Sequence, residues 1–140
     1  MRLVTFEIAK KLKEKGFKEL CLAYYTNDDT LYYNYSHKAG ASYTDCYLSH
    51  NLMPKDSVSG KFADAPTISQ VLKWLRKEKD MYIEIFLYNG TYSYIVKSIT
   101  KISEDDYFHQ CLNEDTTDME YENYEDAALA GIEYALDNLI

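Results

Sequence analysis

The chain has few of the residues that build disulfide-rich, metal-dependent or nucleotide-binding proteins. Its 140 residues include three cysteines, two prolines and five glycines. Cys21, Cys46 and Cys111 are odd in number and widely spaced, which argues against a disulfide framework and favours reduced thiols. The glycines form neither a phosphate-binding loop nor a dinucleotide fingerprint, so the sequence predicts no cofactor.

Long apolar runs and an excess of basic residues are also missing. No run approaches the roughly 20 residues that cross a bilayer, and the N-terminus lacks the apolar stretch of a signal peptide. We therefore expect a cytoplasmic protein. With 15 Lys and Arg against 23 Asp and Glu, the net charge is −8. This charge argues against nucleic acid and anionic membrane as partners, and it suits solubility or a basic partner.

The length and the 46% apolar share predict a single domain, residues 1–140, with one core. The fold class predicted is α+β, in the order helix–hairpin–helix–hairpin–helix. Four to five antiparallel strands are expected, with helices packed mainly on one face. The expected elements are a helix over about 6–15, a hairpin of 20–26 and 31–36, a helix over 67–76, a hairpin of 81–88 and 91–102, and a helix over 124–138.

The most specific local prediction concerns the second hairpin. An Asn89-Gly90 turn places Tyr88 opposite Thr91 and Ile83 opposite Val96. Glu84 then lies diagonal to Lys97 on one face. The other face is expected to be covered by helices, and it carries Met81, Ile83, Ile85, Leu87, Tyr92, Tyr94 and Val96.

Other local patterns mark element ends and a long loop. Thr5 and Asn123 are placed to cap the first and last helices, and Gly16 to end the first. Residues 38–64 lose all periodicity, so we expect a loop that contains an edge strand near 43–48.

Three blocks of the sequence resemble a family of small uncharacterised proteins found in gut Bacteroidetes genomes and in their phages or prophage-like elements. The blocks are Leu3–Leu12, Ala65–Arg76 and Tyr124–Leu136, in the same order as in that family. The resemblance implies an accessory protein of a mobile element, in the bacterial cytoplasm. No activity, cofactor or catalytic residue is established for that family, so the resemblance assigns no site residue to this chain.

Four residues resemble a metal or thiol site. Cys46 and His50 have C-x3-H spacing, and His109 and Cys111 have H-x-C spacing. Two thiolates and two imidazoles suit tetrahedral zinc, but neither half matches a familiar zinc motif. Cys46 beside His37 or His50 could act as a thiol nucleophile only if the side chains meet. A small metal-binding or thiol enzyme using these residues stays an alternative, while our prediction is no enzyme.

Fifteen tyrosines and an acidic segment give the best functional signal. Residues 104–126 contain ten Asp or Glu and no Lys or Arg. Tyrosine is enriched where proteins bind proteins, because it offers a large contact area at low entropic cost. We predict a binding surface for an unknown protein partner at Tyr107, Tyr121, Tyr124, Glu120 and Glu122.

The predicted function is therefore a non-enzymatic protein-binding accessory domain of a mobile element or phage. One alternative is an acidic DNA mimic that inhibits a host nucleic-acid-binding protein. A solvated acidic loop explains the same charges without any function. Self-association through an exposed sheet edge also stays open.

Overall fold

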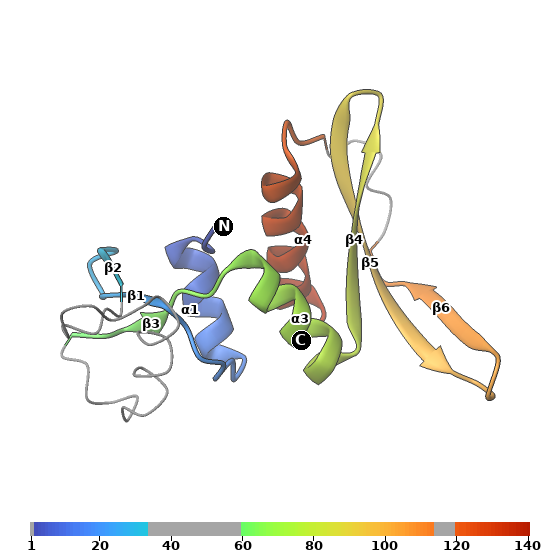
Figure 1. Ribbon diagram of the computed structural model, residues 1–140, viewed down its shortest axis with the longest axis horizontal. Helices are drawn as coiled ribbons and strands as arrows, with labels where there is room; N and C mark the ends of the chain where they lie inside the picture. The colour runs from blue at the N-terminus through green and yellow to red at the C-terminus, as the bar shows by residue number, and fades with distance from the viewer. Residues whose placement is uncertain (1, 34–59, 114–119) are drawn as a thin grey trace, which may run out of the picture. The chain divides into compact units, whose positions relative to one another are not determined.

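The computed structural model describes residues 2–33, 60–113 and 120–140. The chain divides into two compact units, residues 1–67 and 68–140, which we describe separately. In each unit, antiparallel strands form a three-stranded sheet (Figure 1). The predicted α+β class is confirmed, and the single-domain organisation stays a prediction.

Unit 1 begins with the helix α1, Phe6–Glu14. The Ile8 N–H donates to Thr5 Oγ1 at 3.3 Å, which confirms the N-cap. At the other end Gly16 has φ of 87° and the Phe17 N–H donates to the Leu12 carbonyl at 3.0 Å. This is a Schellman ending, and only a residue without Cβ adopts that φ at no steric cost.

The sheet of unit 1 has the order β2-β1-β3, with β1 Ala23–Tyr25, β2 Leu31–Tyr33 and β3 Ala63–Asp64. The first two strands confirm the predicted hairpin. The third corrects the prediction for residues 63–64, which were expected to belong to the loop, since Tyr24 pairs with Asp64. The edge strand predicted near 43–48 lies outside the described residues.

Unit 1 holds α1 against its sheet through aromatic rings and one buried hydroxyl. The Phe6 ring lies 5.5 Å from the Tyr25 ring and 6.0 Å from the Phe62 ring, centroid to centroid. The Tyr25 hydroxyl donates to the Val4 carbonyl at 2.8 Å. Burial raises the pKa of Tyr25, with smaller effects of Asp29 and Tyr33 in the same direction.

Unit 2 contains the long hairpin and two helices. Its elements are α3 Ile68–Lys79, β4 Met81–Tyr88, β5 Thr91–Lys101, β6 Tyr107–Cys111 and α4 Tyr124–Asn138, with sheet order β4-β5-β6. The predicted register is confirmed from Tyr88 opposite Thr91 to Ile83 opposite Val96. Lys97 Nζ lies 2.7 Å from Glu84 Oε2, as the diagonal placement predicts.

The helix α4 covers one face of β4 and β5 (Figure 1). Tyr94 and Val96 are buried there, as predicted, but Leu87 is 61% exposed. Leu87 stands next to the turn, at the end of the hairpin, so the prediction that a helix covers it is wrong. The buried apolar side chains of unit 2 are Ile68, Val71, Trp74, Leu75, Met81, Tyr94, Val96, Ala127, Ala128, Leu129, Ile132, Ala135 and Leu136.

The described residues form six strands, two more than the hairpins supply. The extra strands are β3 and β6, each of which adds to a predicted hairpin. The sequence did not indicate β6 because its five residues are all exposed and therefore show no apolar alternation.

Candidate protein-binding surface

The candidate binding surface begins where β5 extends beyond its pairing with β4. The β4 strand pairs with β5 as far as Ser98, and β6 pairs with Lys97–Lys101 on the opposite side. We call residues 97–111, which comprise the end of β5, the turn and β6, the β5–β6 arm. Figure 1 shows β6 on the side of the sheet away from α4, so the arm extends past the helix.

The arm exposes large apolar side chains. Ile102 is 66% exposed, Tyr107 54% and Phe108 53%. A folded chain normally scatters such residues, and a group of them on one projection indicates an interaction site.

Three carboxylates lie within the same turn. Glu104, Asp105 and Asp106 are all exposed. The Ile102 N–H donates to the Asp106 carbonyl at 2.9 Å, which ties the acidic residues to the apolar ones. Apolar anchors beside carboxylates form a surface that suits an apolar patch rimmed by Lys or Arg.

The negative charge of the chain is concentrated in unit 2. Residues 68–140 contain 6 Lys or Arg and 15 Asp or Glu, a net charge of −9. Residues 1–67 contain 9 and 8, a net charge of +1. The arm therefore belongs to the half of the chain that attracts cations.

The predicted site residues fall into two groups. Tyr121 forms a β-bridge with Tyr92, and the two residues exchange backbone hydrogen bonds of 2.8 and 2.9 Å. Tyr124 is the first residue of α4, and its ring meets that of Tyr92 edge-on at 6.4 Å. Glu120 and Glu122 flank Tyr121 and are exposed.

Tyr107 lies apart from this group. It pairs with Lys101, whereas Tyr121 pairs with Tyr92, nine residues earlier on β5. At the strand rise per residue, the two tyrosines stand roughly 30 Å apart along the sheet. One small partner segment therefore does not reach all five predicted residues.

Tyr121 also contributes to the packing of unit 2. Its ring lies 6.3 Å from that of Tyr94, and the Tyr134 ring lies 6.3 Å from Tyr94 as well. Burial raises the pKa of Tyr121, and the charge of Glu133 adds to the shift. Tyr124, at 45% exposed, is the tyrosine of this group that offers most surface to a partner.

The four residues of the metal or thiol alternative are not brought together in the described part of the chain. His109 and Cys111 stand two apart on β6, so both side chains project from one face of the sheet. Cys46 and His50 lie outside the described residues. Within residues 2–33, 60–113 and 120–140, no three His, Cys, Asp or Glu side chains group as a metal site.

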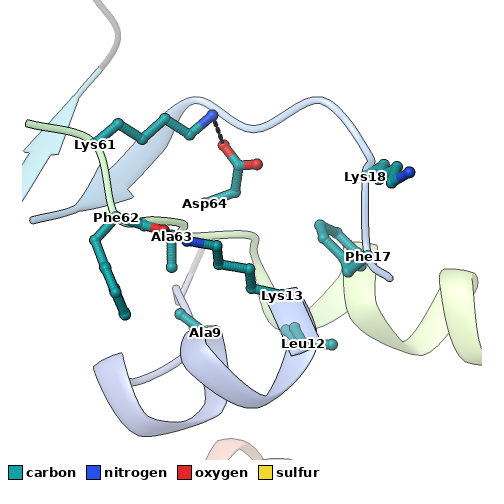
Figure 2. A pocket seen from close by; sticks show the side chains of 9 residues that line it. All are labelled: Ala9, Leu12, Lys13, Phe17, Lys18, Lys61, Phe62, Ala63 and Asp64. Atoms are coloured by element: carbon teal, nitrogen blue, oxygen red, sulfur yellow. Dashed lines mark hydrogen bonds and ion pairs between the residues drawn. The ribbon is translucent and has the colours of Figure 1, made fainter. Parts of the chain in front are cut away.

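Unit 1 contains a pocket of about 240 Å³ between α1 and the β3 segment (Figure 2). Lys13 Nζ donates to the Phe62 carbonyl at 2.6 Å and lies 4.4 Å from the Phe62 ring centroid. Lys61 Nζ lies 2.5 Å from Asp64 Oδ1, and the two side chains are only 10% and 13% exposed. The Lys13 contacts fasten the β3 segment to the helix, whereas the Lys61–Asp64 pair lies within that segment, so these charged groups have a structural role.

The comparisons with known proteins identify no relative of this chain. No protein-family model matches the chain, and neither the curated proteins nor the solved structures yield a match. None of the helices described is long and apolar enough to span a bilayer.

The sequence pointed to Tyr107 but missed Ile102 and Phe108. The sequence contained two signals for these residues. Ile102 and Phe108 lie on either side of the acidic run Glu104–Asp106, and the residues two positions before and after each of them are polar. Such isolated apolar residues beside charges favour a surface position over a core position.

Proposed function

We propose that this chain is a non-enzymatic protein-binding accessory module of a mobile element or phage, and that its partner is basic. The observation that supports this most is the β5–β6 arm, where Ile102, Tyr107 and Phe108 stand exposed around three carboxylates. Exposed apolar area supplies the affinity, and the carboxylates select the charge of the partner.

The arm has the features expected of a binding surface and lacks those of a packing surface. Its five β6 residues are all exposed, although two of them are aromatic. Tyr107 and Phe108 project from opposite faces of the strand. Burying Phe108 against a partner would contribute about 1.5–3 kcal/mol by area, and a partner that wraps the strand would also cover Tyr107. This gain drives association in the proposed function.

The test is capture of a partner from the lysate of a gut Bacteroidetes host, chosen because of the resemblance to that family. Tagged wild type is compared with a Tyr107→Ala/Phe108→Ala variant after nuclease treatment. We expect one basic protein to be enriched by wild type and its recovery to fall at least tenfold with the variant.

A matched control comes from the other end of the same sheet. Leu87→Ala/Tyr88→Ala removes two similarly exposed side chains, at 61% and 67%, from a stretch, residues 85–94, that contains no Asp or Glu. The proposal requires this control to retain the partner. Equal loss with both variants, or none with either, would contradict the assignment of the arm.

A second candidate, the DNA mimic, is favoured by the net charge of −9 in residues 68–140. A mimic competes with DNA for its target, and its affinity falls steeply as salt rises, because exposed charges are screened within about 8 Å at physiological ionic strength. Competition with duplex DNA and a salt titration of the captured complex test it. Binding that is insensitive to both would remove this candidate.

A further inference from the structure

One side of the β6 backbone is bonded to β5, and the other side pairs with no strand among the described residues. Leu112 N–H donates to the Val96 carbonyl at 2.7 Å, and Ile102 N–H donates to the Asp106 carbonyl at 2.9 Å. Bonded and non-bonded pairs alternate in an antiparallel ladder. Residues 108 and 110 therefore direct their backbone groups toward β5, while Tyr107, His109 and Cys111 direct theirs to the opposite edge.

No strand in the described ranges pairs with that edge. Proteins commonly protect an open edge with lysine, proline, a bulge or an inward-pointing charge. The sequence of β6, Tyr-Phe-His-Gln-Cys, contains no Lys, Arg, Asp, Glu or Pro. By contrast β4, the other outer strand, carries Glu84. The outer edge of β6 therefore lacks these protective features and can pair with another strand.

The net charge of unit 2 determines which kind of segment can add to this edge. A second copy would bring two units of net charge −9 together, and like charges repel. A segment with Lys or Arg at one end would instead place its cations beside Glu104, Asp105 and Asp106, which directly precede β6. In an antiparallel arrangement the basic end is the C-terminal end of the added segment.

We propose that an extended segment of a basic partner protein adds to β6 as a fourth strand of this sheet. It bonds the outward N–H and C=O groups of Tyr107, His109 and Cys111, and its basic C-terminal end meets the acidic turn. Main-chain bonds add to the affinity that the exposed apolar side chains supply, and the charges give the complex its selectivity. This proposal rests on the proposed function, because it states how the arm binds.

The test uses amide hydrogen exchange, read by NMR on the whole chain. The probe is a synthetic ten-residue peptide of alternating threonine and valine that ends in three lysines. We expect exchange of the Tyr107, His109 and Cys111 amides to slow at least tenfold, because these amides gain partners. The Phe108 and Gln110 amides, already bonded within the sheet, should change less than twofold. The same peptide ending in three glutamates should leave all five unchanged.

Two variants at one position separate backbone from side chain. His109→Pro removes the outward N–H, and His109→Ala keeps it. We expect the lysine peptide to bind His109→Pro at least tenfold more weakly than wild type, and His109→Ala within twofold. Circular dichroism and the thermal midpoint establish that each variant is folded. If one variant does not fold, the exchange data on the wild-type protein still test the proposal.

Each other outcome overturns the proposal. No slowing with the peptide, or equal binding by His109→Pro, removes strand addition. Slowing that appears without peptide and grows with protein concentration identifies a second copy as the occupant. If capture from lysate still depends on Tyr107 and Phe108 while the amides stay unprotected, the proposed function stands and only strand addition falls.

Discussion

Gly131 of α4 lies directly against the ring of Tyr94 on β5. A Cβ built on Gly131 would stand 3.2 Å from the Tyr94 ring and 2.8 Å from Ile83 Cγ2. The helix therefore approaches the sheet more closely than any side chain at that position allows. This contact buries Tyr94, which is only 2% exposed.

The first prediction is that Gly131→Ala destabilises the protein. In an exposed helix the change would stabilise by about 1 kcal/mol. Here the added methyl overlaps Ile83, whose branched side chain is stiff, and such overpacking costs about 1–3 kcal/mol. We expect a net loss of free energy of unfolding, measured by urea denaturation.

Ile83→Ala provides the control for this prediction, because it removes the Cγ2 atom that the methyl would meet. We expect the double variant to lose less than the sum of the two single losses. A stabilising Gly131→Ala change would show that α4 moves away from the sheet without penalty.

The second prediction concerns alkaline pH. Burial raises the pKa of Tyr94 to about 12, with contributions from Tyr121 and Tyr134. Between pH 10 and about 12 the unfolded chain loses this proton while the folded chain keeps it. The unfolded state then binds fewer protons, so stability falls as pH rises, by up to about 1.4 kcal/mol per pH unit from this group.

Tyr94→Phe isolates that effect, because phenylalanine has no proton to lose. The free energy of unfolding of this variant should decline less steeply than that of wild type from pH 10 to 12, and below pH 9 the two curves should run parallel. Identical slopes across the alkaline range would contradict the shifted pKa.

The third prediction concerns Asn113, which follows β6 in the chain and whose buried side-chain amide bonds the backbone of β5. Its Oδ1 accepts the Val96 N–H at 2.7 Å, and its Nδ2 donates to the Tyr94 carbonyl at 3.5 Å. Asn113→Leu leaves the Val96 N–H buried without an acceptor. We expect a loss of about 1–3 kcal/mol in thermal or urea unfolding.

Asn138→Ala is the matched control, since that amide donates to the Tyr134 carbonyl on the surface at 3.1 Å. It should change stability by less than about 0.5 kcal/mol. If Asn113→Leu also changes stability by less than about 0.5 kcal/mol, then water or a backbone shift provides an acceptor for the Val96 N–H, and the Asn113 side chain does not stabilise the edge of β5.

The hairpin was predictable because two independent signals agree. The Asn89-Gly90 turn fixes the register, and both residues adopt the positive φ that this turn needs, 51° and 79°. Alternation of apolar residues along β4 and β5 then assigns the faces. The same agreement of cap and periodicity placed α4 at Tyr124–Asn138.

The third strands and the site were harder to predict. Both β3 and β6 depend on pairing partners rather than on a pattern of their own, and β3 has only two residues. The separation of Tyr107 from Tyr121 depends on where each segment pairs along β5. Nearness in the sequence therefore gives no indication of this separation.

The last prediction tests the ion pair within the β3 segment of unit 1. Lys61 and Asp64 are paired with little exposure, and beyond this ion pair neither Lys61 Nζ nor Asp64 Oδ1 has a hydrogen-bond partner among the described residues. Removing one partner leaves the other charge buried. We expect Lys61→Met alone, and Asp64→Leu alone, each to cost about 3 kcal/mol in urea unfolding.

The double variant Lys61→Met/Asp64→Leu decides what the pair contributes. An apolar pair of similar size removes both desolvation penalties, and buried ion pairs are often replaced in this way without loss. We therefore expect the double variant to recover at least half of the summed single losses. Strictly additive losses would mean that the two charges act independently and that their pairing contributes nothing to stability.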